Sequence, residues 1–177
     1  HLYDLNGVKP VISISRNYPF KENFTHLIGY VSQANQNDIE NTEVIKKNFV
    51  PGLKVGKVGL EKSFEKKLIG SNDIERYEVN AYGRRISQLE FQKGEKGKNL
   101  RLTIDTEVQK LANELLKDQA GSICVMDIYT GDVIAMHSSP SFDPNLFVFG
   151  ISKDDWQLIR NDPMKPLVNK TLQGNYS

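Results

Sequence analysis

A serine followed three residues later by a lysine, Ser63-Phe64-Glu65-Lys66, has the spacing with which some acyl-transfer enzymes pair a serine nucleophile with a lysine. Such a nucleophile belongs at a helix N-terminus, where backbone N–H groups can hold an oxyanion. The pattern predicts that Ser63 lies in the middle of a helix, on a face crowded with lysines. The chain also contains no Lys-Thr/Ser-Gly, and Ser15-Arg16-Asn17 is a chance Ser-x-Asn match. We therefore predict that the chain has no catalytic serine.

Two further patterns also lack the groups that their chemistry needs. Gly52 to Lys57 resembles a phosphate-binding loop, but its spacing is one residue short and no Ser or Thr follows the lysine to hold Mg²⁺. Asp154 and Asp155 could be read as paired catalytic carboxylates. Neighbouring residues of a helix point about 100° apart, however, and both aspartates lie in a predicted first turn, where they favour the positive helix end.

Histidine and cysteine usage predicts neither a metal site nor a cofactor. The chain has three histidines without His-x-x-x-His spacing and a single cysteine, Cys124. A packing or hydrogen-bonding role is favoured for His26 over a functional one. Cys124 lies in an apolar run and is predicted to be a small core residue.

Charge divides the chain into two parts. Residues 1–98 contain 16 basic and 12 acidic residues, whereas residues 99–177 contain 7 and 10, for a net charge of +1 overall. Neither part is basic enough to suggest nucleic-acid binding. The change of sign coincides with the polar, glycine-rich segment 92–98, which we predict to be a linker.

The C-terminal part begins with a clear pattern of elements. Alternation predicts a strand at 100–104, and Asp105 is a predicted N-cap for a helix with an apolar stripe (Val108, Leu111, Ala112, Leu115 and Leu116). Apolar runs at 122–128 and 133–136 predict a hairpin whose first strand is central, with a layer on each side. A capping box at 152–155 predicts another helix, in which Trp156 is a core or interface anchor.

The N-terminal part reads as short elements. We predict a strand at 11–15, a short helix within 24–31, a loop with one helical turn at 35–48, and a helix at about 60–69. Alternation at 76–80 and 84–91 predicts a second hairpin. The fold class is therefore α+β, an N-terminal module of hairpins and short helices followed by a strand–helix–hairpin.

Several motifs resemble the class B penicillin-binding proteins, and the match is best with their elongation-specific group, penicillin-binding protein 2. The loop 139–147, with Pro140, Asp143, Pro144 and Asn145, resembles the loop after the first hairpin of that family's transpeptidase domain. The runs 161–163, 166–170 and 174–177 resemble the approach to its nucleophile helix. Segments 18–20 and 26–31 resemble its Tyr-Pro and His-x-x-Gly-Tyr-Val patterns.

Two more motifs resemble the non-catalytic module of class B proteins. Gly56, Gly59 and Glu61 match its Gly-x-x-Gly-x-Glu, and Tyr82-Gly83-Arg84 resembles its Arg-Gly-Arg with the first arginine replaced. The resemblance places Glu61 and Arg84 at the junction with the transpeptidase domain, where we interpret them as an ion pair that fixes the hinge angle. Alternatively, both are solvated charges, each worth less than about 1 kcal/mol.

The resemblance implies a division into residues 1–98, part of a non-catalytic pedestal or dimerisation module, and 99–177, the start of a transpeptidase domain that ends before its Ser-x-x-Lys motif. The whole protein is then expected to be a periplasmic, membrane-anchored serine D,D-transpeptidase that acts on peptidoglycan stem peptides and is acylated by β-lactams.

The same resemblance implies that this chain is inactive alone and that its pedestal binds an elongation-complex glycosyltransferase and regulators. The exposed edge of the 123–136 hairpin suggests that the isolated chain could form a homodimer. The alternative is an extracytoplasmic α+β protein-interaction domain unrelated to transpeptidation.

Overall fold

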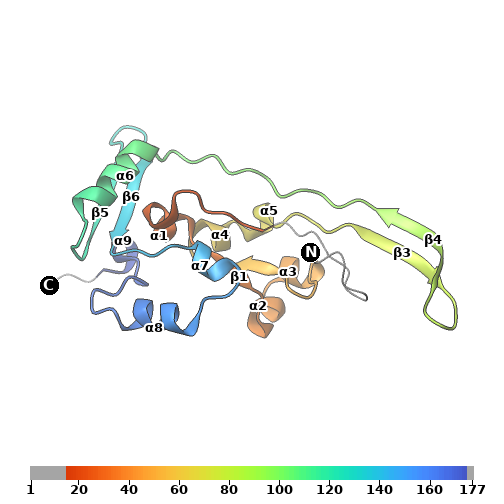
Figure 1. The fold of residues 1–177 in the computed structure, drawn as a ribbon. Coiled ribbons are helices and arrows are strands. Elements are labelled where there is room, and N and C mark those ends of the chain that lie inside the picture. The colour runs from red at the N-terminus through yellow and green to blue at the C-terminus, as the bar shows by residue number, and fades with distance from the viewer. Residues whose placement is uncertain (1–14, 175–177) are drawn as a thin grey trace.

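The computed structural model describes residues 15–174, and the fold of this part is α+β (Figure 1). Its strands form three separate antiparallel pairs, β1–β2, β3–β4 and β5–β6. Within these residues, no helix has the length and apolar character needed to cross a membrane. Of the predicted strand at 11–15, residues 11–14 lie outside the described residues. The elements are η2 (Lys21–Asn23, a 3-10 helix), α1 (Thr25–Ile28), β1 (Val31–Gln33), α2 (Gln36–Asn41), α3 (Glu43–Lys47), β2 (Lys54–Gly56), α4 (Gly59–Ser63), α5 (Glu65–Leu68), β3 (Ile74–Val79), β4 (Arg85–Gln92), α6 (Thr106–Leu115), β5 (Gly121–Met126), β6 (Val133–Ser139), α7 (Asn145–Val148), α8 (Lys153–Asn161) and α9 (Lys170–Gln173).

The two predicted hairpins are both present and lie at opposite ends of the molecule (Figure 1). β3–β4 extends away from the short helices, and all eight residues of β4 are exposed. In β5–β6, Ile123 is paired with His137. The two strands differ in burial, because Ser138 and its neighbours in β6 are buried whereas the second half of β5 is exposed.

Helix α6 begins where its cap predicts, but its buried face differs from the predicted stripe. The Asp105 carboxylate accepts hydrogen bonds from the backbone N–H groups of Glu107 and Val108. The buried residues of α6 are Gln109 and Ala112, whereas Leu111 and Leu115 are more than half exposed. The helix therefore packs on β6 through a polar residue that periodicity did not single out.

Gln109 connects three segments through its side-chain amide. Its Nε2 donates to the Met136 carbonyl at 2.9 Å and to the Asn23 carbonyl at 2.7 Å, and its Oε1 accepts from the Met136 N–H at 2.8 Å. These partners are backbone groups of β6 and η2. An apolar residue of the same size at position 109 would leave them without these hydrogen bonds.

Two predictions for the C-terminal part are wrong. Residues 100–104 form no strand, because their alternating leucines line a groove instead of facing a partner strand. β5 is not a central strand, since its partner among the described residues is β6 alone. Cys124 is consequently exposed and is not the core residue that we expected.

Three differences in the N-terminal part involve elements too short for periodicity to reveal. Residues 35–48 contain two helices, α2 and α3, the first with an Asn35–Asp38 capping box. β1 and β2 form a three-residue ladder that was not predicted. The predicted helix at 60–69 is divided at Phe64 into α4 and α5.

The predicted linker 92–98 lies directly against the backbone of residues 67–73, which accounts for its glycines. The Lys98 N–H donates to the Lys67 carbonyl at 2.7 Å, and the Ser71 N–H donates to the Glu95 carbonyl at 2.8 Å. A Cβ atom on Gly97 would lie 2.0 Å from the Leu68 carbonyl oxygen. The glycines of segment 92–98 thus allow two segments of the backbone to approach each other closely.

We therefore expect Gly97→Ala to lower the free energy of unfolding by about 2 kcal/mol, because the added methyl group forces two backbones apart. Chemical denaturation measures the change. Gly121→Ala is the matched control, because its Cβ would meet only a Leu116 methyl carbon at 3.4 Å. Equal stability of the two variants would contradict the close packing of segment 92–98.

Candidate functional site

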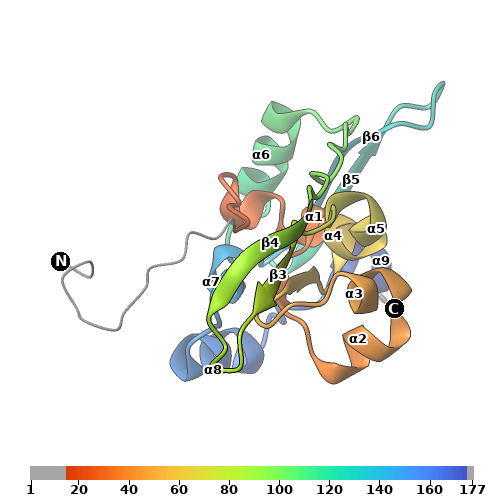
Figure 2. The ribbon, with the colours of Figure 1, turned by 90° about the vertical axis from the view of Figure 1, so that its right-hand side faces the viewer.

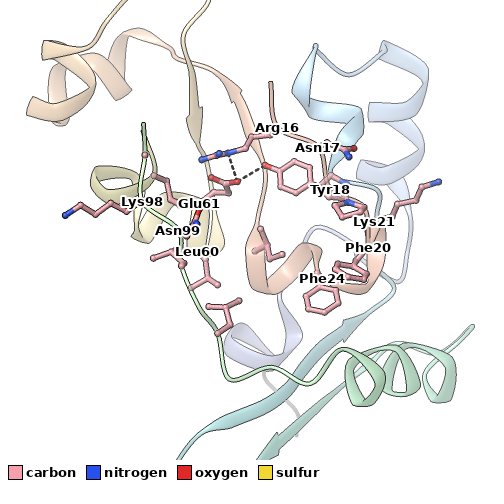
Figure 3. Close-up of a pocket in the computed structure, with 17 residues that line it drawn as sticks. Arg16, Asn17, Tyr18, Phe20, Lys21, Phe24, Leu60, Glu61, Lys98 and Asn99 are labelled. Carbon is pink, nitrogen blue, oxygen red and sulfur yellow. Dashed lines mark hydrogen bonds and ion pairs between the residues drawn. The ribbon is translucent and has the colours of Figure 1, made fainter. Parts of the chain in front are cut away.

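The best-defined polar cluster centres on Glu61, the last residue of the Gly-x-x-Gly-x-Glu motif (Figure 3). Glu61 is 6% exposed. The Glu61 Oε1 atom lies 3.1 Å from the Arg16 Nε and accepts a hydrogen bond from the Tyr18 hydroxyl at 3.2 Å. The Tyr18 hydroxyl in turn accepts from the Val31 N–H at 3.0 Å. Burial and the Glu61 carboxylate raise the pKa of Tyr18, so the phenol stays neutral and donates.

The two glycines of the motif bring α4 close enough for this arrangement. A Cβ on Gly56 would lie 2.3 Å from the Glu61 carbonyl carbon. Gly59 has φ +63° and packs against the end of α1, where a Cβ would lie 2.7 Å from the Leu27 carbonyl oxygen. Because only glycine fits both positions, the spacing of the motif fixes where the Glu61 carboxylate points.

Asn145 joins Tyr18 to the 139–147 loop through the backbone. Its Oδ1 accepts from the Tyr18 N–H and its Nδ2 donates to the Tyr18 carbonyl, both at 3.0 Å. Asp143 orients this amide, because the Asp143 Oδ1 accepts from the Asn145 N–H at 2.9 Å and from its Nδ2 at 2.8 Å. The Thr25 hydroxyl also donates to the Phe142 carbonyl at 2.6 Å. We call these contacts, with those of Glu61, the junction.

The prolines of the loop shape its path beside the junction. Pro144 is fully buried and precedes α7 as its N-cap, and the Ser139–Pro140 peptide bond is cis. An aromatic cluster covers the loop. Its members are Tyr30, Phe142, Phe147 and Trp156, and the Tyr30 and Phe147 rings stack at 4.1 Å.

A groove of about 500 Å³ lies on the other side of Tyr18, between residues 16–24, α4 and residues 97–102 (Figure 3). Its wall is mostly apolar, with Phe20, Phe24 and Leu60, and basic side chains including Lys21 and Lys98 also line it. No serine, cysteine or histidine lines it. The described residues also contain no cluster of three potential metal ligands.

Arg84 and Gly83 are not part of the junction, so the expected ion pair between Glu61 and Arg84 is wrong. Both residues lie in the turn of the extended β3–β4 hairpin, where Gly83 has φ +75° and the Arg84 N–H donates to the Asn80 Oδ1 at 2.9 Å (Figure 1). The partner of Glu61 is Arg16. The sequence signal that could have identified it is the Arg16-x-Tyr18 spacing, which places two Glu61 partners on one side of an extended segment.

Ser63 does not lie at a helix N-terminus. Ser63 is the last residue of α4 rather than a mid-helix residue, so it lies at the negative end of the helix. The aspartates at 154 and 155 lie in the first turn of α8, and Asp155 forms the cap with Ser152. The structure thus places Ser63 at the end of one helix and the two aspartates at the start of another.

Comparisons with known proteins agree with this arrangement. The family model of the penicillin-binding protein dimerisation domain matches residues 1–102. Peptidoglycan D,D-transpeptidase MrdA of Escherichia coli K12 is 41% identical over 176 residues, which are 98% of this chain and 28% of that protein. Penicillin-binding protein 3 of Bacillus subtilis is 33% identical over 170 residues, 94% of this chain and 25% of that protein.

Solved structures give the same result. The complex between PBP2 and MreC from Helicobacter pylori matches with a TM-score of 0.81 and 32% identity, over 96% of this chain and 31% of that one. Pseudomonas aeruginosa PBP2 in complex with WCK 5153 matches with a TM-score of 0.75 and 33% identity, over 94% of this chain and 33% of that one.

The chain therefore belongs to the penicillin-binding protein dimerisation domain family. Its relatives of the MrdA and PBP2 group confirm the resemblance seen in the sequence, and the chain spans less than a third of their length.

We expect Glu61→Gln to lower the free energy of unfolding by about 2 kcal/mol, because it removes the charge that Arg16 and the Tyr18 hydroxyl share in a buried position. Urea denaturation at neutral pH measures this. The matched control is Glu90→Gln, which breaks an exposed cross-strand pair with Arg76 and should cost less than about 1 kcal/mol. A smaller effect at position 61 than at position 90 would refute the central role of Glu61.

Asn145→Ala should cost about 2–3 kcal/mol of unfolding free energy, because it leaves the Tyr18 N–H and carbonyl without their partners. The shift of the denaturation midpoint reports the loss. Asn41→Ala serves as the control, since Asn41 bonds only to exposed groups of its own helix, and we expect a change within about 0.5 kcal/mol. Similar midpoints for the two variants would show that Asn145 does not hold the loop.

Proposed function

We propose that this chain is the non-catalytic scaffold and interaction part of a peptidoglycan D,D-transpeptidase that acts in cell-wall elongation. Residues 1–98 form part of its pedestal and residues 99–177 begin its transpeptidase domain. The observation that carries the proposal is the junction, because Glu61 and Asn145 both bind Tyr18. One residue of the first part thus bonds both to α4 of the pedestal and to the loop of the second part.

In this proposal, the D,D-transpeptidase activity belongs to the longer protein. A serine nucleophile in a Ser-x-x-Lys motif beyond residue 177 attacks the stem peptide or a β-lactam, and the residues described here position the domain that carries it. By the same family resemblance, the chain of residues 1–177 is inactive alone. The likeness to MrdA supports a position at the periplasmic face of the inner membrane, with an anchor outside this chain.

The partners proposed for the pedestal are proteins of the elongation machinery. The Helicobacter pylori structure contains PBP2 with MreC, which supports a regulator of this kind as a partner. A membrane-embedded glycosyltransferase is the second proposed partner, by family resemblance. Self-association of the isolated chain would use the edge of β5, whose second half is exposed.

The test separates acylation from partner coupling in the full-length protein. Full-length protein carrying Glu61→Gln and Asn145→Ala together should lose the partner-dependent stimulation of glycan synthesis, because the junction no longer fixes the pedestal. Its acylation by a fluorescent penicillin should stay within about threefold of wild type, since the junction contains no reacting group. The chain of residues 1–177 alone should not be labelled.

Glu90→Gln in the full-length protein is the control and should leave both activities unchanged. Loss of acylation with intact partner stimulation would reverse the assigned roles. Labelling of the 177-residue chain by the penicillin would overturn the assignment of an inactive chain.

A further inference from the structure

Two histidines from different parts of the chain, one partly buried and one buried, lie near enough to influence each other's charge beside the junction. His26 belongs to α1, and His137 belongs to β6 and is 1% exposed. The Nε2 atoms of both rings are buried and have no hydrogen-bond partner among the described residues. A proton added to either Nε2 atom would therefore have no acceptor among these residues.

The groups that face the two rings disfavour a positive charge. Burial, together with Lys170 of α9 and His137 of β6, lowers the pKa of His26 to about 4, although the carbonyls of Pro140 and Pro166 oppose the shift. Burial also lowers the pKa of His137, against the effect of the Asn23 carbonyl. Phe142 faces the His26 ring edge to face at 5.9 Å. No carboxylate among residues 15–174 pairs with either ring.

The backbone of the same two residues holds α9 in place. The Asn169 Nδ2 donates to the His26 carbonyl and the Thr171 hydroxyl donates to the His137 carbonyl, both at 3.1 Å. The next residue of β6 adds a third contact, because the Ser138 Oγ accepts from the Lys170 N–H at 2.9 Å. The position of α9 therefore depends on α1 and β6 staying together.

We propose that His26 and His137 form a proton-sensitive lock, which holds α9 against α1 and β6 while both rings are neutral and releases it when a ring is protonated. The inference goes beyond the scaffold function proposed above. A buried imidazole with a depressed pKa binds protons less readily than one in an open state, whose pKa is about 6.5. The closed state is thus fully favoured above about pH 6.5 and loses its advantage as the pH falls toward 4.

Trp156, the single tryptophan of the chain, reports on the lock. Its ring contacts Phe147 at 6.3 Å, Phe147 contacts Phe142 at 5.4 Å, and Phe142 faces His26. We expect the wild-type fluorescence to change between pH 7.5 and 5, with an opening equilibrium constant that rises about 30-fold at pH 5 for the cited pKa of His26. The far-UV circular dichroism should stay unchanged, because α9 has four residues.

His26→Gln should remove most of this pH dependence, and the control His1→Gln, which changes the remaining histidine of the chain, should preserve it. An unchanged pH dependence in His26→Gln, or its loss in His1→Gln, would overturn the proposal. A cooperative loss of the far-UV signal over the same pH range would do so as well, because it indicates unfolding of the whole chain.

A second measurement follows the histidines of the wild type directly. The imidazole Cε1–H resonances, followed by NMR from pH 8 to 4, should give one histidine that titrates below about pH 5 and a second below about 6.5. Assignment of His26 by comparison with His26→Gln identifies the first. Titration of all three histidines near pH 6.5 would show that the rings are accessible and that no lock exists.

Discussion

The structure depends on one buried carboxylate. A glutamate that is 6% exposed costs free energy unless its charge is paired and its lone pairs are filled, and Glu61 meets this condition through Arg16 and Tyr18. Both partners come from a segment with no regular structure of its own, so the need to satisfy the Glu61 carboxylate determines where this segment lies. The Tyr18 backbone then gives Asn145 a donor and an acceptor at fixed positions. These two hydrogen bonds determine where the 139–147 loop lies.

Backbone contact is the second constraint. The elements of this chain are short, and Figure 2, which looks at the molecule from the β3–β4 end, shows the hairpin in front of the short helices. Gly56 and Gly59 allow α4 to approach its neighbours, and Gly97 allows segment 92–98 to approach the end of α5. In a chain with few fully buried apolar side chains, such contacts let backbone groups pair directly.

Elements with local signals could be predicted from the sequence. The Asp105 and Ser152 caps and the turns of both hairpins correctly place α6, α8 and the β3–β4 and β5–β6 pairs. Relations between distant residues could not be predicted in the same way. The spacing of a motif identifies Glu61 as important but does not say which of several arginines reaches it, since Arg16 is 45 positions away. Alternating leucines at 100–104 likewise fit a strand and a groove wall equally well, because both bury every second side chain.

Gln109 illustrates why periodicity alone could not identify the contacts that hold the parts together. An apolar stripe in the sequence indicates which face of a helix is buried. The segments of this structure are joined mostly by hydrogen bonds from a side chain of one segment to the backbone of another. Examples are Gln109 to β6 and η2, Asn145 to Tyr18, Thr25 to Phe142, and Asn169 to His26. Such bonds are directional, and a buried backbone group that loses its partner costs more than the bond contributes. Apolar contacts of the same area would allow the segments to slide, whereas these bonds permit one relative orientation. A fixed orientation is the property that the scaffold role proposed above requires.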